Sequence, residues 1–158
     1  MKKHIYFDKY KGDFWPSIDE LKPYFIADKG QQWFNSGGND TAGLDLIGVD
    51  GTGSKPFGKG RKDIGLSMWG KPGLGVLIIY ERTGSADFLD AYTSKGDITR
   101  LGELVRSMHA TPLPVGLFIP FADAWKAVKE FMETEGQLPK SIEWVRNADL
   151  PPNTFPDP

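Results

Sequence analysis

The chain has 158 residues, with 19 basic and 21 acidic side chains, a formal net charge of −2 and no cysteine. The length suits one domain over residues 1–158, and no apolar run is long enough to span a membrane. The balanced charge argues against a broad nucleic-acid surface, and the lack of cysteine excludes a disulfide framework, a thiolate nucleophile and a cysteine-based zinc site. The basic N-terminus, MKKHIYFDKYKGDF, lacks the apolar core of a secretion signal, so we expect the protein to stay in the cytoplasm.

The first elements of the chain are predicted to be a short strand and a short helix. Residues 5–7 indicate the strand. Ser17 and Glu20 have the spacing of a capping box, in which each side chain accepts a hydrogen bond from the other residue's backbone N–H. Pro23 is expected to keep the helix after it short or kinked, because proline has no N–H to continue the helical ladder.

A β-hairpin is predicted in the middle of the chain. Residues 44–49 alternate weakly and indicate a strand, and residues 51–62 form a connection rich in glycine, lysine and proline. Residues 64–69 and 74–80 then read as two strands joined over Lys71-Pro72-Gly73, where proline presets φ and glycine supplies a positive φ. These segments predict an antiparallel sheet.

The C-terminal half is predicted to run strand, helix, strand. Residues 115–119 are a short apolar run with prolines only at its ends, and residues 141–145 alternate enough for a returning strand. Between them, apolar residues recur every three or four positions over 121–135, and Gly136 follows as a helix terminator. The predicted buried positions of this helix are Trp125, Val128 and Met132, and its predicted exposed positions are Lys126, Lys129, Glu130 and Glu133. The expected fold class is α+β: an antiparallel β-sheet with one main amphipathic helix packed on a face and a shorter N-terminal helix.

Catalytic and ligand-binding motifs are absent from the sequence pattern. A phosphate loop requires lysine directly after its last glycine, but in the segment 51–55 Ser54 intervenes and Pro56 follows. The two histidines, His4 and His109, are in no metal-ligand motif. We therefore predict no metal, no cofactor and no enzymatic activity.

Several features of the second half match a known family pattern. They are the Ile119-Pro120 entry into a helix, the alanine-containing helix 124–131, Gly136, Pro139, the tryptophan strand 142–144, the apolar strand 75–80, and the turn containing Ser94, Gly96 and Asp97. In these features the chain resembles bacterial immunity proteins that are encoded beside deaminase-class and other polymorphic toxins.

The resemblance implies a protein that binds a cognate toxin domain and occludes its active site, so that the toxin made by the same cell or a neighbour is held inactive. It implies a protein partner and neither nucleic acid nor membrane, and it leaves the oligomeric state open. Two other functions remain alternatives: a small-ligand module that binds a sugar or nucleotide, and a hydrolase that reverses toxin damage.

The residues 81–97 are predicted to be a long, irregular connection at the sheet edge that faces the toxin. Their carboxylates would complement a cationic cleft, and aromatic side chains would anchor the contact. The predicted interface comprises Trp69, Glu81, Asp87, Phe88, Asp90, Tyr92 and Asp97. The alternatives are that Phe88, Tyr92 and Trp69 are core residues, or that the basic loop 55–62 meets the partner instead.

Overall fold

The computed structural model describes residues 1–27, 31–33, 40–84 and 88–158. Within these residues an eight-stranded antiparallel sheet has the order β10-β6-β5-β4-β3-β1-β2, with β9 pairing to β5, and β7 and β8 form a separate small sheet. The strands are β1 (Lys2–Phe7), β2 (Tyr10–Gly12), β3 (Thr41–Ile47), β4 (Asp63–Lys71), β5 (Gly75–Thr83), β6 (Phe88–Ser94), β7 (Leu104–Arg106), β8 (Pro112–Pro114), β9 (Phe118–Ile119) and β10 (Trp144–Arg146). The helices are α1 (Ile18–Leu21), α2 (Pro23–Ile26) and α3 (Phe121–Glu133), with 3₁₀ turns η2 (Ile98–Arg100), η3 (Val115–Leu117) and η4 (Asn147–Asp149).

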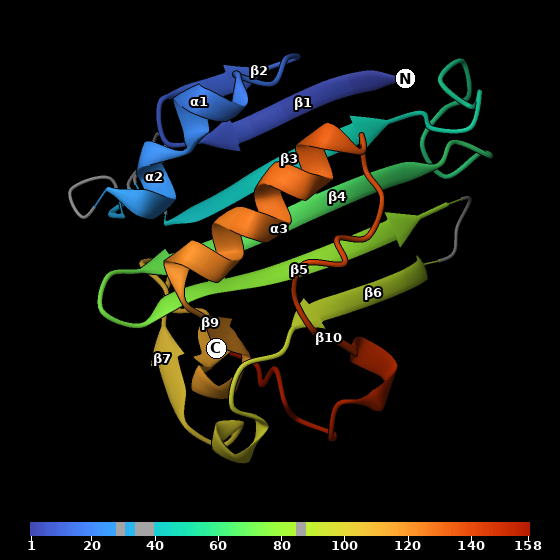
Figure 1. Cartoon of the computed structure of the whole chain (residues 1–158). Coiled ribbons are helices and arrows are strands. Elements are labelled where there is room, and N and C mark those ends of the chain that lie inside the picture. The colour runs from blue at the N-terminus through green and yellow to red at the C-terminus, as the bar shows by residue number, and fades with distance from the viewer. Residues whose placement is uncertain (28–30, 34–39, 85–87) are drawn as a thin grey trace.

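All three α-helices lie on the same side of the large sheet (Figure 1). The predicted α+β class is therefore confirmed, with α3 as the main helix across the sheet. The N-terminal helix is bent as expected, because α1 ends at Leu21 and α2 begins at Pro23. The predicted capping box of Ser17 and Glu20 is present at the start of α1, with both reciprocal hydrogen bonds formed.

The amphipathic prediction for α3 is confirmed, with one exception. Trp125, Val128 and Met132 are buried against the sheet. Glu130 was expected in water, but its carboxylate accepts hydrogen bonds from the backbone N–H groups of Lys140 at 2.6 Å and Ser141 at 3.0 Å. This helix residue therefore holds the chain that returns toward the sheet.

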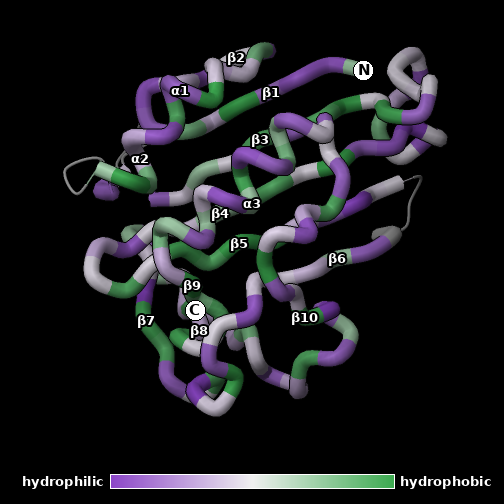
Figure 2. The backbone as a smooth tube through the Cα atoms, in the orientation of Figure 1, coloured by the Kyte–Doolittle hydropathy of each residue, from purple (hydrophilic) through white to green (hydrophobic). Residues whose placement is uncertain are grey.

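The core lies between α3 and the sheet. Side chains alternate in direction along each strand, so every second residue of a central strand such as β4 points into this core. Ile64, Leu66 and Met68 of β4 are buried there. The first half of β5 is instead apolar almost without alternation, as its colour in Figure 2 shows. The reason is a second small cluster on the far face, where Leu77 packs with Leu113, Leu117 and Phe118. Among the described residues, no helix has the length and apolar character needed to cross a bilayer.

Three local predictions were wrong or too long. Residues 115–119 were expected to be one strand, but η3 replaces most of it and only Phe118–Ile119 pairs with β5. The turn packs closely on the backbone of Asp97, since a Cβ at Gly116 would collide with the carbonyl oxygen of Asp97. The strand expected at 141–145 is reduced to β10, since the N–H of Ser141 already donates to Glu130.

The third error concerns residues 81–97, which were expected to be an irregular connection. The strand β5 continues to Thr83, and β6 occupies Phe88–Ser94 as its antiparallel neighbour, with a register irregularity between Arg82 and Thr83. Most of the predicted loop is therefore sheet. Its side chains point alternately to opposite faces, which decides what they can contact.

Candidate functional site

The face of the sheet opposite α3 is covered only in part. At its covered end, Trp69 packs with the cluster around Leu77, together with Leu74, Ile79 and Val105. Trp69 was predicted at the tip of a turn, but it is the seventh residue of β4 and is half-buried opposite Leu77. The structure therefore favours a packing role for this tryptophan.

The other end of the same face carries polar side chains from four strands. Strand register brings them together: His4 pairs with Asp45, Asp45 pairs with Gly65, and Gly65 pairs with Glu81. In the next row Tyr6 pairs with Gly43 and Gly43 pairs with Ser67. We call this region the open face and define it as His4, Tyr6, Asp45, Gly65, Ser67 and Glu81. All six are half-buried.

The open face is hollowed at its centre. A hollow of about 230 Å³ lies around Gly65, and the side chains at its walls are Asp45, Ile47, Asp63, Ser67, Glu81 and Thr83. Every residue that lines it comes from β3, β4 or β5, so no other described segment closes it. Glycine makes the hollow, because a Cβ at position 65 would lie 2.8 Å from Oδ1 of Asp45.

The carboxylates of the hollow differ in their partners. The Asp63 carboxylate accepts hydrogen bonds from the guanidinium of Arg61, with Nη2 at 2.9 Å, and from the N–H of Gly48 at 3.0 Å. Burial raises the pKa of Asp45 to about 6; the charge of His4 opposes this rise, and the charges of Asp63 and Glu81 each add a smaller contribution to it. Burial also raises the pKa of Glu81. Among the described residues, Asp45 and Glu81 make no ion pair.

The predicted interface residues do not lie together on this face. Of the predicted set, Glu81 is on the open face, but Asp90 and Tyr92 are on the same side of the sheet as α3, as their register with Arg82 and Tyr80 shows. Asp97 lies beyond β6, where its carboxylate accepts the N–H of Thr99 at 3.1 Å and caps η2. Asp87 lies outside the described residues, and Phe88 begins β6 with a side chain that is likewise outside the description.

Asp90 and Tyr92 already have intramolecular roles. The Asp90 carboxylate accepts the backbone N–H of Ala91 at 3.0 Å and lies 4.0 Å from the Arg146 guanidinium. The Tyr92 ring packs near Tyr80, with centroids 6.4 Å apart. The alternative that Tyr92 is a core residue is therefore supported in part, since it packs against the main core and stays half-exposed.

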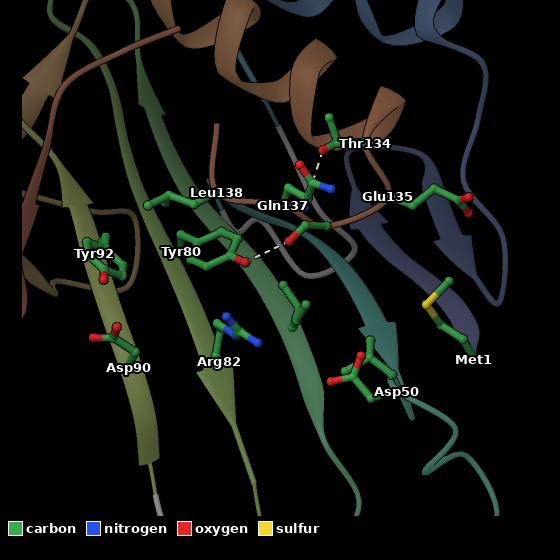
Figure 3. A pocket seen from close by; sticks show the side chains of 13 residues that line it. Met1, Asp50, Tyr80, Arg82, Asp90, Tyr92, Thr134, Glu135, Gln137 and Leu138 are labelled. Atoms are coloured by element: carbon green, nitrogen blue, oxygen red, sulfur yellow. Dashed lines mark hydrogen bonds between the residues drawn. The ribbon is translucent and has the colours of Figure 1, made fainter. Parts of the chain in front are cut away.

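A second hollow lies at the C-terminal end of α3. It has a volume of about 420 Å³ and is lined by Tyr80, Arg82, Asp90, Tyr92 and the segment 134–138, among others. Figure 3 shows the Arg82 and Asp90 side chains entering it from neighbouring strands, and the Tyr80 hydroxyl donating to the Gly136 carbonyl. This helix-end pocket is polar at its mouth and aromatic at its base.

The remaining candidates show local structural roles. In the basic loop 55–62, the Arg61 guanidinium stacks over Phe57 at 5.1 Å, and Phe57 is 69% exposed. His4 is part of β1, and its Nδ1 lies 3.1 Å from Asp13. Within the described parts of the chain, no three histidine or carboxylate side chains are grouped so that they could hold a metal ion.

The sheet strands β5, β6 and β10 and the helix α3 lie in one stretch of sequence that matches a known family. Residues 71–146 match the family model of Immunity protein Imm1. This match confirms the resemblance to bacterial immunity proteins and supports an immunity function, with a toxin as the general kind of partner. No curated protein and no solved structure matches the chain.

The match to Imm1 begins at residue 71, so it includes Glu81 but not Asp45 or Gly65. Sequence reasoning missed both residues, although a signal was present. In 63–67 and 43–46 the polar or glycine positions alternate with apolar ones, and this period places Asp45, Gly65 and Ser67 on the face away from the core.

Proposed function

We propose that the protein is a single immunity-type domain over residues 1–158 that acts in the cytoplasm. It binds a cognate polymorphic toxin encoded beside it and occludes the toxin's active site in a stoichiometric complex, without catalysis of its own. The observation that carries the proposal is the match of residues 71–146 to the Imm1 family. The protein would protect the cell that makes it from its own toxin or from that of a neighbour.

The open face supports this proposal by its charge. It has two half-buried carboxylates, Asp45 and Glu81, that form no ion pair with a described cation. A toxin that acts on nucleic acid or nucleotides needs a cationic cleft for its substrate, and an acidic surface is complementary to such a cleft. The predicted acidic segment that contains Asp87 and Asp90 remains a second proposed contact region.

The experiment is an inhibition assay with the product of the adjacent gene. We expect the purified protein to co-elute with this toxin domain and to abolish its activity at a one-to-one ratio. A toxin domain from an unrelated locus is the control and should remain active. Full toxin activity in the presence of excess protein, with no complex on gel filtration, would contradict the proposal.

A small-ligand function is the second candidate, because the helix-end pocket offers a suitable volume. Its 420 Å³ falls within the range of about 300–1,000 Å³ that is typical of small-molecule sites. A nucleotide phosphate would contact Arg82, and a base or sugar would stack on Tyr92. Thermal unfolding with a panel of nucleotides and sugars tests this, with Arg82→Gln as the control. A rise in melting temperature that the variant loses would favour this second function.

A further inference from the structure

Five residues lie in one row on the side of the sheet opposite α3, one from each of five strands. The row runs His4, Asp45, Gly65, Glu81 and Ala91, as each successive strand pairing gives. Neighbouring strands lie about 4.8 Å apart, so the Cα atoms of Asp45 and Glu81 are separated by roughly 10 Å, with only glycine between them. The two carboxylates therefore face one another across a gap without a side chain.

The size of this gap limits what can occupy it. At about 230 Å³ the hollow is below the range of about 300–1,000 Å³ that is usual for small-molecule sites. It does admit one side chain that enters from solvent. A metal ion is a poor occupant, because no three histidine or carboxylate side chains among the described residues are grouped so that they could hold one.

The cations around the hollow pair with carboxylates other than Asp45 and Glu81. Nζ of Lys2 lies 3.6 Å from Asp13, and Nδ1 of His4 lies 3.1 Å from the same carboxylate. The Arg61 guanidinium is paired with Asp63. The titratable groups near Asp45 are His4 and Tyr6 from β1, Asp63 from β4 and Glu81 from β5. His4 favours the negative charge of Asp45, whereas the two carboxylates repel it. Half-buried carboxylates that form no ion pair are unfavourable in the free protein, and a directly bound cation would relieve this.

We propose that the cognate toxin inserts an arginine side chain into this hollow, with its guanidinium bridging Asp45 and Glu81 over Gly65. This inference rests on the proposed immunity function, and it specifies which type of toxin side chain binds in the hollow. Arginine suits the geometry better than lysine, because its planar fork of five N–H donors reaches two carboxylates at once and is less strongly hydrated than an ammonium group. Desolvated charge pairs of this kind act as anchors at the centre of an interface.

The first test measures the affinity of isosteric variants for the purified toxin domain encoded by the adjacent gene. Asp45→Asn and Glu81→Gln should each raise the dissociation constant by about 30-fold or more, as expected when one partner of a buried charge pair is removed. Glu133→Gln, which removes an exposed carboxylate from α3, is the matched control and should change the constant by less than about threefold. Wild-type affinity in both Asp45→Asn and Glu81→Gln would overturn the inference.

A second variant tests the hollow without changing charge. Gly65→Ala places a methyl group on its floor, against the flexible end of the Asp45 side chain, and should weaken binding by about tenfold or more while the protein still folds. Gly102→Ala is the control, since a Cβ there meets no atom within 4 Å. Equal affinity of the two alanine variants would contradict insertion into the hollow.

A partner-free measurement separates this inference from the proposed function. Carbon-13 NMR of the side-chain carboxyl groups is recorded while N-acetyl-arginine amide is added to the protein, with N-acetyl-citrulline amide as the neutral control. We expect saturable shifts at Asp45 and Glu81 with the arginine compound alone, and loss of the Glu81 shift in Asp45→Asn. Failure of the wild-type protein to bind the toxin contradicts the proposed function, whereas the absence of any arginine-dependent shift contradicts the hollow as a guanidinium site.

Discussion

The hydroxyl group of Tyr80 in β5 donates a 2.7 Å hydrogen bond to the carbonyl oxygen of Gly136, just after α3. The Gly136 N–H in turn donates to the carbonyl of Phe131, and Glu135 takes a left-handed φ of 50° between them. This is a Schellman termination, in which Glu135 rather than the predicted Gly136 occupies the first left-handed position. Tyr80 is 2% exposed, so the bond fixes the helix exit to the sheet inside the core.

Tyr80→Phe should therefore lower the free energy of unfolding by about 1–2 kcal/mol, because it leaves the buried Gly136 carbonyl without its donor. Urea denaturation followed by tryptophan fluorescence measures this loss. Tyr92→Phe removes the hydroxyl of a half-exposed ring and should cost less than about 0.5 kcal/mol. Similar losses in the two variants would show that the hydroxyl bond of Tyr80 does not secure the helix exit.

Val128→Asp should abolish cooperative folding. Val128 is fully buried between α3 and the sheet, and the variant would place an unpaired charge there at a cost of about 4 kcal/mol or more. Far-ultraviolet circular dichroism through a thermal ramp detects the loss of the transition. The matched control is Ala122→Asp, on the exposed side of the first turn of α3, where a carboxylate is favourable. A retained sharp transition in Val128→Asp would refute the burial argument.

Asp45 should make a contribution to stability that falls as the pH rises from about 4 to 7. Its pKa is about 6 in the folded protein and 3.8 ordinarily, so the folded state binds the proton more tightly in this interval. The stabilisation that comes from the bound proton of Asp45 is fully present below about pH 4 and is lost as the pH rises through about 6. The contribution of Asp45 to the free energy of unfolding should fall by about 1–2 kcal/mol over this interval, after allowance for solvent screening.

Urea denaturation at several pH values measures this dependence in the wild type and in Asp45→Asn. The variant should show a flatter profile and a higher relative stability at pH 7. Asp123→Asn, at the surface of α3, should keep the wild-type slope. An unchanged slope in Asp45→Asn would contradict the assignment of this effect to Asp45.

Association rates should distinguish the two proposed contact regions. Glu81→Lys should slow association with the toxin domain markedly and reduce its dependence on salt, since charge on the open face would steer the encounter. Asp90→Lys should have a smaller effect, because the Asp90 carboxylate is bonded to Ala91 and lies near Arg146 on the other side of the sheet.

Stopped-flow measurements at low and high salt provide these rates, with intact folding checked for each variant. A larger effect of Asp90→Lys, or of Asp87→Lys, would place the encounter at the sheet edge instead. Unchanged rates for both regions, and for variants of Phe88, Tyr92 and Trp69, would move the interface to the basic loop 55–62.

The sequence by itself determined the features that depend on neighbours a few residues apart. The capping box of Ser17 and Glu20, the break before Pro23, the turn at 71–74 and the buried stripe of α3 were all predicted and are present. Each depends on helix periodicity or on the φ preferences of proline and glycine, which act locally. The second-half motifs likewise indicated the immunity family that the Imm1 match supports.

Only the tertiary structure decided how distant segments meet. The strand β6 was mistaken for a loop because its partner β5 and the edge strand β10, rather than its own composition, give it a place in the sheet. Asp45 and Glu81 are 36 positions apart in sequence and become neighbours across Gly65 through the register of three strands. Register is fixed by the burial of one whole face against α3, and a shift of one residue would turn both carboxylates into the core.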